Sequence, residues 1–167
     1  AIETEYLLGP SILVAPVLNP GGYVNVYLPP GDWYDLWTGE KKQGASTYRM
    51  KVDLDHMPVY IRANAIIPTA ELSDSVPDIW DQLTFDIYPQ SDGLFEIPEE
   101  NGLASTTIRV TGGGSKQVEA NGPERAWDFV FRDVDEPGEV SIDLGDSESE
   151  SSWKYDSRSR NLQVHAG

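Results

Sequence analysis

Three segments decide the fold of this chain: LLGPSILVAPV (residues 7–17), YLPPGDWYDLWTG (residues 27–39) and MPVYIRANAIIP (residues 57–68). Each contains a short apolar run bounded by Pro or Gly, a pattern typical of β-strands. Tyr23–Leu28, which runs into the second segment, alternates strictly, with Val24, Val26 and Leu28 on one face. The 167 residues include 12 Pro and 15 Gly, which divide the chain into pieces too short for long helices. The sequence therefore predicts an all-β protein.

A first module is expected over residues 11–70. Its strands are predicted at Ser11–Leu18, Tyr23–Leu28, Trp33–Trp37 and Thr47–Val52, followed by two apolar runs within Met57–Ile67. Asn64 suits the corner between these two runs because Asn tolerates the left-handed conformation. Residues 1–10 precede the module, and we interpret Thr4–Leu8 as the remnant of a helix or linker that leaves a preceding domain.

A second module is expected over residues 83–167. Residues 71–82 lack periodicity and contain Pro77, so they predict a connector between the modules. Strands are predicted at Leu83–Tyr88, Leu94–Ile97, Thr106–Val110, Trp127–Phe131, Glu139–Leu144, Ser152–Tyr155 and Asn161–His165. Short strands at this spacing are typical of antiparallel sandwiches, so the fold class expected is all-β with two antiparallel β-sandwich modules.

The composition excludes several classes of partner. Twenty-eight acidic against 12 basic residues give a net charge of −16, which argues against nucleic acid or an anionic membrane as a partner. Cys is absent, so neither a disulfide framework nor thiol chemistry is expected, and the compartment stays open. No apolar run approaches the length of a transmembrane helix, and no signal peptide is evident.

The acidic and histidine residues predict no catalytic, cofactor or metal site. A catalytic pair of carboxylates has to lie close together in space, and its members usually come from the ends of different strands. The acids that cluster in sequence are therefore interpreted as structural or solvated, namely Asp53, Asp55, Glu96, Glu99 and Glu100. His56 lies beside two of these acids, but His165 is the only other His, so a metal site is not expected.

Three aromatic residues are the candidate contact residues. Trp33, Tyr34 and Trp37 lie within one predicted strand, and alternation puts the two Trp on one face and Tyr34 on the other. They are interpreted as a core or as an interface with a barrel, and the alternative is a platform that stacks on sugar rings.

The three opening segments, in this order, resemble the region that follows the catalytic barrel in glycoside hydrolase family 31, the α-glucosidase and α-xylosidase family. Residues 83–95, LTFDIYPQSDGLF, resemble the start of that family's distal C-terminal domain. The resemblance implies that residues 11–70 are the proximal and residues 83–167 the distal β-sandwich of such an enzyme. It also implies that the catalytic acids lie on the barrel, upstream of anything in this chain.

The resulting hypothesis is a non-catalytic C-terminal portion of a secreted or otherwise soluble, retaining α-glycosidase. Its partner would be the barrel of the same enzyme, through which the oligosaccharide substrate is bound, and the isolated chain is expected to be inactive. The alternative is a carbohydrate-binding module in which Trp33, Tyr34 and Trp37 form an exposed platform. A structural sandwich without any partner is the third possibility.

Overall fold

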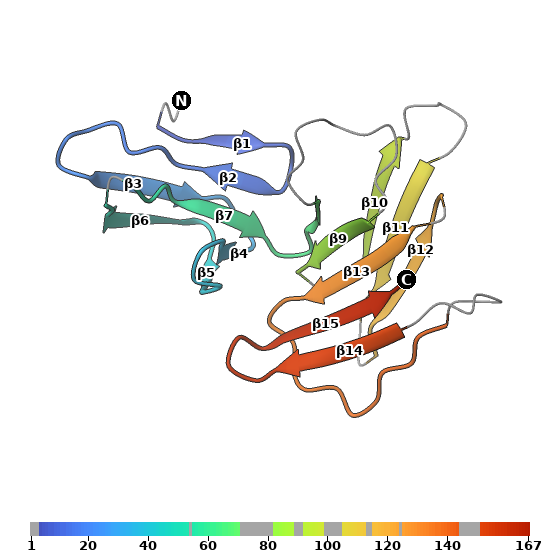
Figure 1. Ribbon diagram of the computed structural model, residues 1–167. Coiled ribbons are helices and arrows are strands. Elements are labelled where there is room, and N and C mark those ends of the chain that lie inside the picture. Colours follow the sequence, from blue (N-terminus) through green and yellow to red (C-terminus); the bar gives the residue numbers. More distant parts are fainter. Residues whose placement is uncertain are drawn as a thin grey trace. The chain divides into compact units, whose positions relative to one another are not determined.

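A computed structural model describes residues 4–53, 55–70, 82–88, 92–98, 105–112, 115–123, 125–143 and 151–167. These residues form fifteen β-strands and divide into two compact units, residues 1–63 and residues 64–167 (Figure 1). The described part of the chain contains no helix that could cross a membrane. The all-β class expected from the sequence is confirmed.

The first unit combines a five-stranded sheet with a two-stranded ribbon, and every strand pair in it is antiparallel. The sheet has the order β1 (Tyr6–Leu8), β2 (Ile12–Val14), β7 (Val59–Arg62), β4 (Asp32–Asp35) and β5 (Lys41–Gln43). The ribbon pairs β3 (Tyr23–Leu28) with β6 (Ser46–Lys51). The alternation of β3 is confirmed, since Val24, Val26 and Leu28 are buried and join Leu13, Ala15, Trp33 and Tyr60 in one core.

Three expectations for this unit were wrong in detail. Residues 6–8 form strand β1, which pairs with β2, and not a helix or linker. The strand expected at Ser11–Leu18 is shorter in the structure and spans Ile12–Val14, because Pro16 has no N–H group to donate to a neighbouring strand. β4 ends at Asp35 rather than at Trp37, and β5 was missed because its sequence, Lys41–Gln43, carries no apolar residue.

The second unit packs a five-stranded and a three-stranded sheet around a second core. The larger sheet has the order β14 (Ser151–Asp156), β15 (Asn161–Ala166), β13 (Ala126–Phe131), β9 (Gln82–Ile87) and β8 (Ile66–Thr69). The smaller one is β10 (Gly93–Pro98), β11 (Ser105–Thr111) and β12 (Gln117–Asn121). The core contains Ile66, Leu83, Phe85, Ile87, Ile108, Val110, Phe129, Phe131 and Val134.

One strand pair departs from the antiparallel pattern. β9 and β13 are parallel, with Phe85 opposite Phe129. Parallel neighbours require a long crossover, which the chain makes through β10, β11 and β12 of the other sheet. β12 has no counterpart among the strands expected from the sequence, and residues 139–143, where a strand was expected, form none.

The division between the units falls before β8. This strand pairs with β9, and Ile66 belongs to the second core, whereas the sequence analysis assigned residues 64–70 to the first module. Asn64 begins the second unit with a positive φ of 74°, as expected for a corner. Its backbone N–H donates to the Tyr88 carbonyl at 2.6 Å. Of the expected connector at residues 71–82, residues 71–81 lie outside the described residues.

Phe85 is the centre of the second core, and its replacement tests that core. The ring is fully buried and contacts Phe95, Trp127 and Phe129 at centroid distances of 6.0–6.5 Å. Phe85→Ala is expected to lower the free energy of unfolding by about 3–5 kcal/mol in urea denaturation. Leu94→Ala, at a site 57% exposed, is the control and should change it by less than about 0.5 kcal/mol. Equal effects of the two substitutions would contradict this core.

The ionisation of Tyr60 makes the stability of the first unit depend on pH in the alkaline range. Burial, with a further contribution from the negative charges of Asp35 and Glu40, raises the pKa of Tyr60 to about 12. The native state therefore favours the neutral phenol. Its contribution to the free energy of unfolding is complete below the pKa of Tyr in the unfolded chain, near 10, and is lost as the pH rises through 12. Between pH 9 and pH 11 the wild type should lose about 1.4 kcal/mol more unfolding free energy than Tyr60→Phe. An equal loss in both proteins, measured by urea denaturation, would refute this assignment.

Candidate functional site

The acids and histidines singled out in the sequence do not assemble into a catalytic or metal site. Asp53, Asp55 and Glu96 are exposed, and Glu99 and Glu100 lie outside the described residues. His56 is also exposed and contacts an aromatic ring rather than a group of acids. Among the residues that the structure describes, no group of three or more His, Asp or Glu side chains could hold a metal ion.

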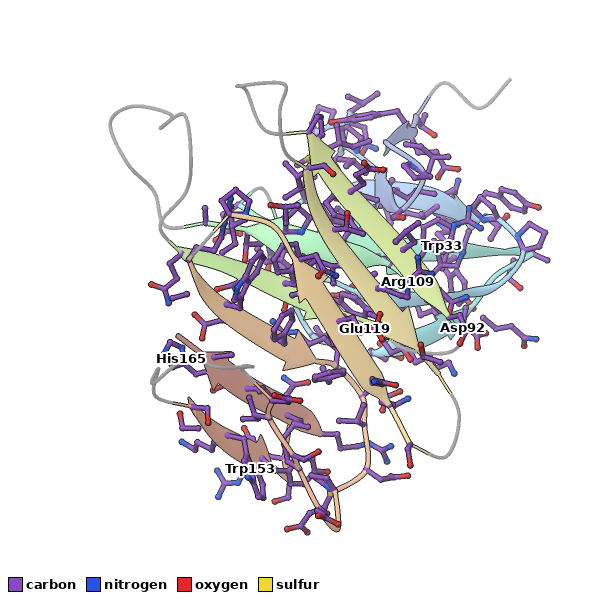
Figure 2. All side chains as sticks on the ribbon, turned by 90° about the vertical axis from the view of Figure 1, so that its right-hand side faces the viewer. Trp33, Asp92, Arg109, Glu119, Trp153 and His165 are labelled. Carbon is purple, nitrogen blue, oxygen red and sulfur yellow. The ribbon has the colours of Figure 1, made fainter. Side chains whose placement is uncertain are left out.

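Trp33 and Tyr34 are interior residues. Trp33, which is labelled in Figure 2, is 0% exposed and Tyr34 is 3% exposed, so neither presents a ring to a ligand. The Trp33 indole N–H donates to the Pro29 carbonyl at 2.8 Å, and the guanidinium of Arg62 lies 4.5 Å from the ring centroid. These contacts give Trp33 a structural role, and a sugar platform made of all three aromatic residues is not formed.

Trp37 is the exposed member of the three, with 54% of its surface accessible. The turn at residues 36–39 carries it, because the Asp35 carboxylate accepts the backbone N–H groups of Trp37 and Thr38 at 3.0 and 2.9 Å. This local bonding by Asp ends the strand and starts the turn. Strand alternation therefore ends at Asp35, so Trp37 does not share a strand face with Trp33. The turn-forming Asp35 is the feature of the sequence that indicates this end.

The Trp37 side chain is held in place although it is exposed. Its indole N–H donates to the Met57 carbonyl at 2.7 Å, and its ring lies 5.3 Å from the His56 ring at a tilt of 57°. Leu36 and Met57 are 44% and 43% exposed. Leu36, Trp37, His56 and Met57 are here called the Trp37 cluster, whose central ring is exposed but held by a hydrogen bond and a ring contact.

Strand β1 exposes a second set of apolar side chains in the same unit. Tyr6, Leu7 and Leu8 are 53%, 48% and 61% exposed, so both faces of this edge strand are open. The preceding Glu5 accepts the Tyr27 amide at 3.0 Å, which ties the start of β1 to β3. Burial raises the pKa of the Glu5 carboxyl, while this hydrogen bond acts in the opposite direction.

The two sets are the candidate functional surfaces of the first unit, one on the edge strand β1 and one at the turn that follows β4. Exposed edge strands are normally charged or covered, whereas β1, although short, carries three large apolar residues without a charge among them. Contiguous exposed apolar residues mark binding surfaces for other proteins or domains. The chemistry available here is therefore binding of an apolar partner, not acid–base or nucleophilic catalysis.

The different roles of the two tryptophans can be separated by truncation. Trp33→Ala should lower the free energy of unfolding by about 3–5 kcal/mol, because it empties a filled core position. Trp37→Ala should cost less than about 1.5 kcal/mol, since it removes one hydrogen bond and a half-exposed ring. Urea denaturation of the two variants checks this difference, and a larger loss for Trp37→Ala would place that ring in the core.

Comparison with known proteins gives these surfaces a context. Residues 1–67 match the family model described as the glycosyl hydrolase family 31 C-terminal domain. An α-xylosidase of Saccharolobus solfataricus is 36% identical over 104 residues, covering 60% of this chain and 14% of that protein. Alpha-glucosidase 2 of Bacillus thermoamyloliquefaciens is 33% identical over 92 residues, which cover 53% of this chain and 11% of that protein.

A solved structure extends the likeness to both units. The cycloalternan-forming enzyme of Listeria monocytogenes, in complex with a pentasaccharide substrate, matches with a TM-score of 0.85 and 26% identity. The match covers 99% of this chain and 18% of that one. The chain is thus similar to a small C-terminal β-sandwich region of these relatives, and in those proteins that region accompanies a catalytic barrel.

Proposed function

From this relationship to the C-terminal β-sandwich region of glycosyl hydrolase family 31, we propose that the chain is the non-catalytic C-terminal portion of a retaining α-glycoside hydrolase. The enzyme is of the α-glucosidase or α-xylosidase type, as in the relatives named above. The chain supports the flank of a catalytic barrel that lies elsewhere in the same enzyme, on the same or another polypeptide. The oligosaccharide substrate is bound and cleaved in that barrel.

The observation that carries this proposal is the apolar surface of the first unit. β1 and the Trp37 cluster both lie within residues 1–67, the segment matched by the family model. Fully burying a large apolar side chain contributes about 1.5–3 kcal/mol, so covering several of them supplies substantial docking energy. Trp37 is already fixed by Met57 and His56, which reduces the entropy lost when a partner covers it.

The acids of the chain support a non-catalytic role. Retaining hydrolysis requires a nucleophilic carboxylate and a second carboxylic acid whose pKa is raised so that it protonates the leaving oxygen. Asp53, Asp55 and Glu96 are exposed side chains, whereas a catalytic acid of this kind acts in an enclosed site. The isolated chain is therefore expected to hydrolyse neither p-nitrophenyl α-glucoside nor p-nitrophenyl α-xyloside.

The proposal is tested by recombining the chain with the barrel of its own enzyme, produced as a separate polypeptide. The two should form a stable complex in native mass measurements. Leu7→Glu and Trp37→Ala should each weaken the complex at least about tenfold, because both remove a partly exposed apolar anchor. Leu94→Glu is the matched control, since it changes an exposed Leu of the second unit.

Two results would refute this function. One is hydrolytic activity that persists in the highly purified chain without a barrel. The other is a complex whose affinity is unchanged by both Leu7→Glu and Trp37→Ala.

The alternative function, a carbohydrate-binding module, has one supporting observation. Trp37 presents an exposed ring that is held by a hydrogen bond, as a stacking residue for a sugar requires. Glucan or xyloglucan oligosaccharides would then quench the Trp fluorescence of the isolated chain, and Trp37→Ala would abolish the quenching. With Trp33 and Tyr34 buried, this site would consist of one ring, which makes it the weaker candidate.

A further inference from the structure

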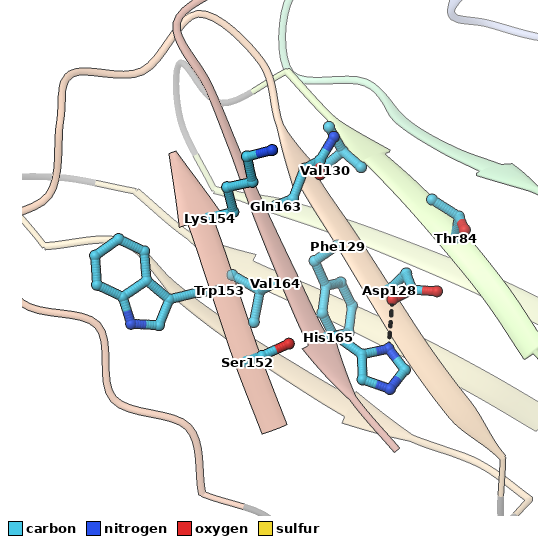
Figure 3. Close-up of a pocket in the computed structure, with 10 residues that line it drawn as sticks. All are labelled: Thr84, Asp128, Phe129, Val130, Ser152, Trp153, Lys154, Gln163, Val164 and His165. Atoms are coloured by element: carbon cyan, nitrogen blue, oxygen red, sulfur yellow. Dashed lines mark hydrogen bonds and ion pairs between the residues drawn. The ribbon is translucent and has the colours of Figure 1, made fainter. Parts of the chain in front are cut away.

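We propose that the outer face of the larger sheet in the second unit carries a separate binding site for a short neutral saccharide, distinct from the Trp37 cluster. The assignment of α-linked glucose or xylose residues as its ligand rests on the proposed function. The site is a groove of about 300 Å³ over β9, β13, β15 and β14, and its polar side chains are Thr84, Asp128, Gln163, His165, Ser152 and Lys154 (Figure 3).

Strand register explains why these side chains meet. Across the sheet, Thr84 lies opposite Asp128, Asp128 opposite His165 and His165 opposite Ser152. Lys154 lies opposite Gln163 in the next row of the same face. Because side chains alternate, the neighbouring positions Phe85, Phe129 and Val164 point into the core. The sheet thus has one apolar face and one polar face, and the groove lies on the polar one.

The Asp128 carboxylate is preorganised as an acceptor. One of its oxygens lies 2.7 Å from His165 Nδ1. The other accepts a hydrogen bond from the side-chain amide of Gln82 at 2.5 Å. Each carboxylate oxygen has two lone-pair directions, so both oxygens keep capacity for a further hydrogen bond. Two adjacent hydroxyl groups of a pyranose ring match this arrangement, since each donates one hydrogen bond.

The remaining groups also suit a neutral polyhydroxyl ligand. Ser152, Thr84 and the Gln163 amide can both donate and accept, and Lys154 only donates. Val130, which also lines the groove, offers an apolar floor for the C–H face of a sugar. A volume of about 300 Å³ is at the lower limit of small-molecule pockets, which fits a short saccharide.

Charge argues against ionic ligands. Residues 64–167 contain 21 acids and 7 bases, so the unit repels anions. Asp128 supplies the single carboxylate among the residues that line the groove, and this carboxylate is already contacted by His165 and Gln82. The groove therefore offers few ligands for a cation. A neutral ligand with many hydroxyl groups avoids both difficulties.

The row Ser152, His165 and Asp128 has the residue types of a hydrolytic triad but not its geometry. Its members come from three different strands, β14, β15 and β13. The structure gives Ser152 no hydrogen bond to His165, and such a bond is what activates a serine nucleophile. These groups are therefore assigned to binding, not to hydrolysis.

Binding should be weak. Trp153 lies on β14, but its ring points away from Asp128 and His165, so it does not stack on a sugar held between those two residues (Figure 3). Hydrogen bonds in an open groove, without such a platform, correspond to a Kd in the range of about 1 mM.

The test is an NMR titration of the ¹⁵N-labelled chain with maltotriose and isomaltotriose. Saturable shifts are expected for the amide signals of Asp128, Gln163 and His165. Asp128→Asn should weaken binding at least about tenfold, because it removes the charged acceptor. Lys154→Ala, at an exposed position that does not threaten folding, should weaken it at least about threefold.

The controls separate this site from the other proposals. Leu94→Ala, at an exposed position outside the groove, should leave the titration unchanged, and the β-linked cellotriose should bind more weakly than either α-linked sugar. The inference is overturned if no signal saturates up to about 20 mM sugar, if both groove variants bind like wild type, or if the shifts occur in the first unit. Because the recombination experiment measures association with a barrel and not sugar binding, failure of one proposal is distinguishable from failure of the other.

Discussion

The parallel register between β9 and β13 is the constraint on which the second unit depends. It sets Phe85 opposite Phe129 in the core and, one residue earlier, Thr84 opposite Asp128 on the outer face. A slip of one residue would exchange the two faces of a strand, which would expose Phe rings and bury a carboxylate. The same pairing therefore builds the apolar core and the polar groove, and neither can shift without the other.

Sequence reasoning predicted the strands that alternate and missed those that do not. β3 and β9 were recognisable because one face of each is buried, as Val26 and Phe85 show. β1 and β5 are edge strands without an alternating pattern, so periodicity gave no signal for them. The family resemblance rested on residues 7–68 and needed no strand assignment, which explains why it could be recognised despite these errors.

The candidate surfaces were less accessible to prediction than the fold. Trp33, Tyr34 and Trp37 were grouped by extending one strand, but the hydrogen bonds of Asp35 end that strand and send Trp37 to the surface. The groove could not be predicted, since Thr84, Asp128 and His165 are brought together only by the pairing of distant strands. Charge is also divided unevenly, with 7 acids and 5 bases in residues 1–63, so the apolar surface lies in the nearly neutral unit, as interface cores require.

The place where one unit ends and the next begins limits how the two can be exchanged between proteins. The backbone N–H of Ala63 donates to the carbonyl of Asp32 in the first unit, and that of the next residue, Asn64, donates to the carbonyl of Tyr88 in the second. No residue therefore separates the hydrogen bonds of one unit from those of the other. β8 follows at once and supplies Ile66 to the second core. A gene fusion with its breakpoint at residue 70 would leave that sheet without its edge strand. A transferable cassette therefore has to begin at Asn64.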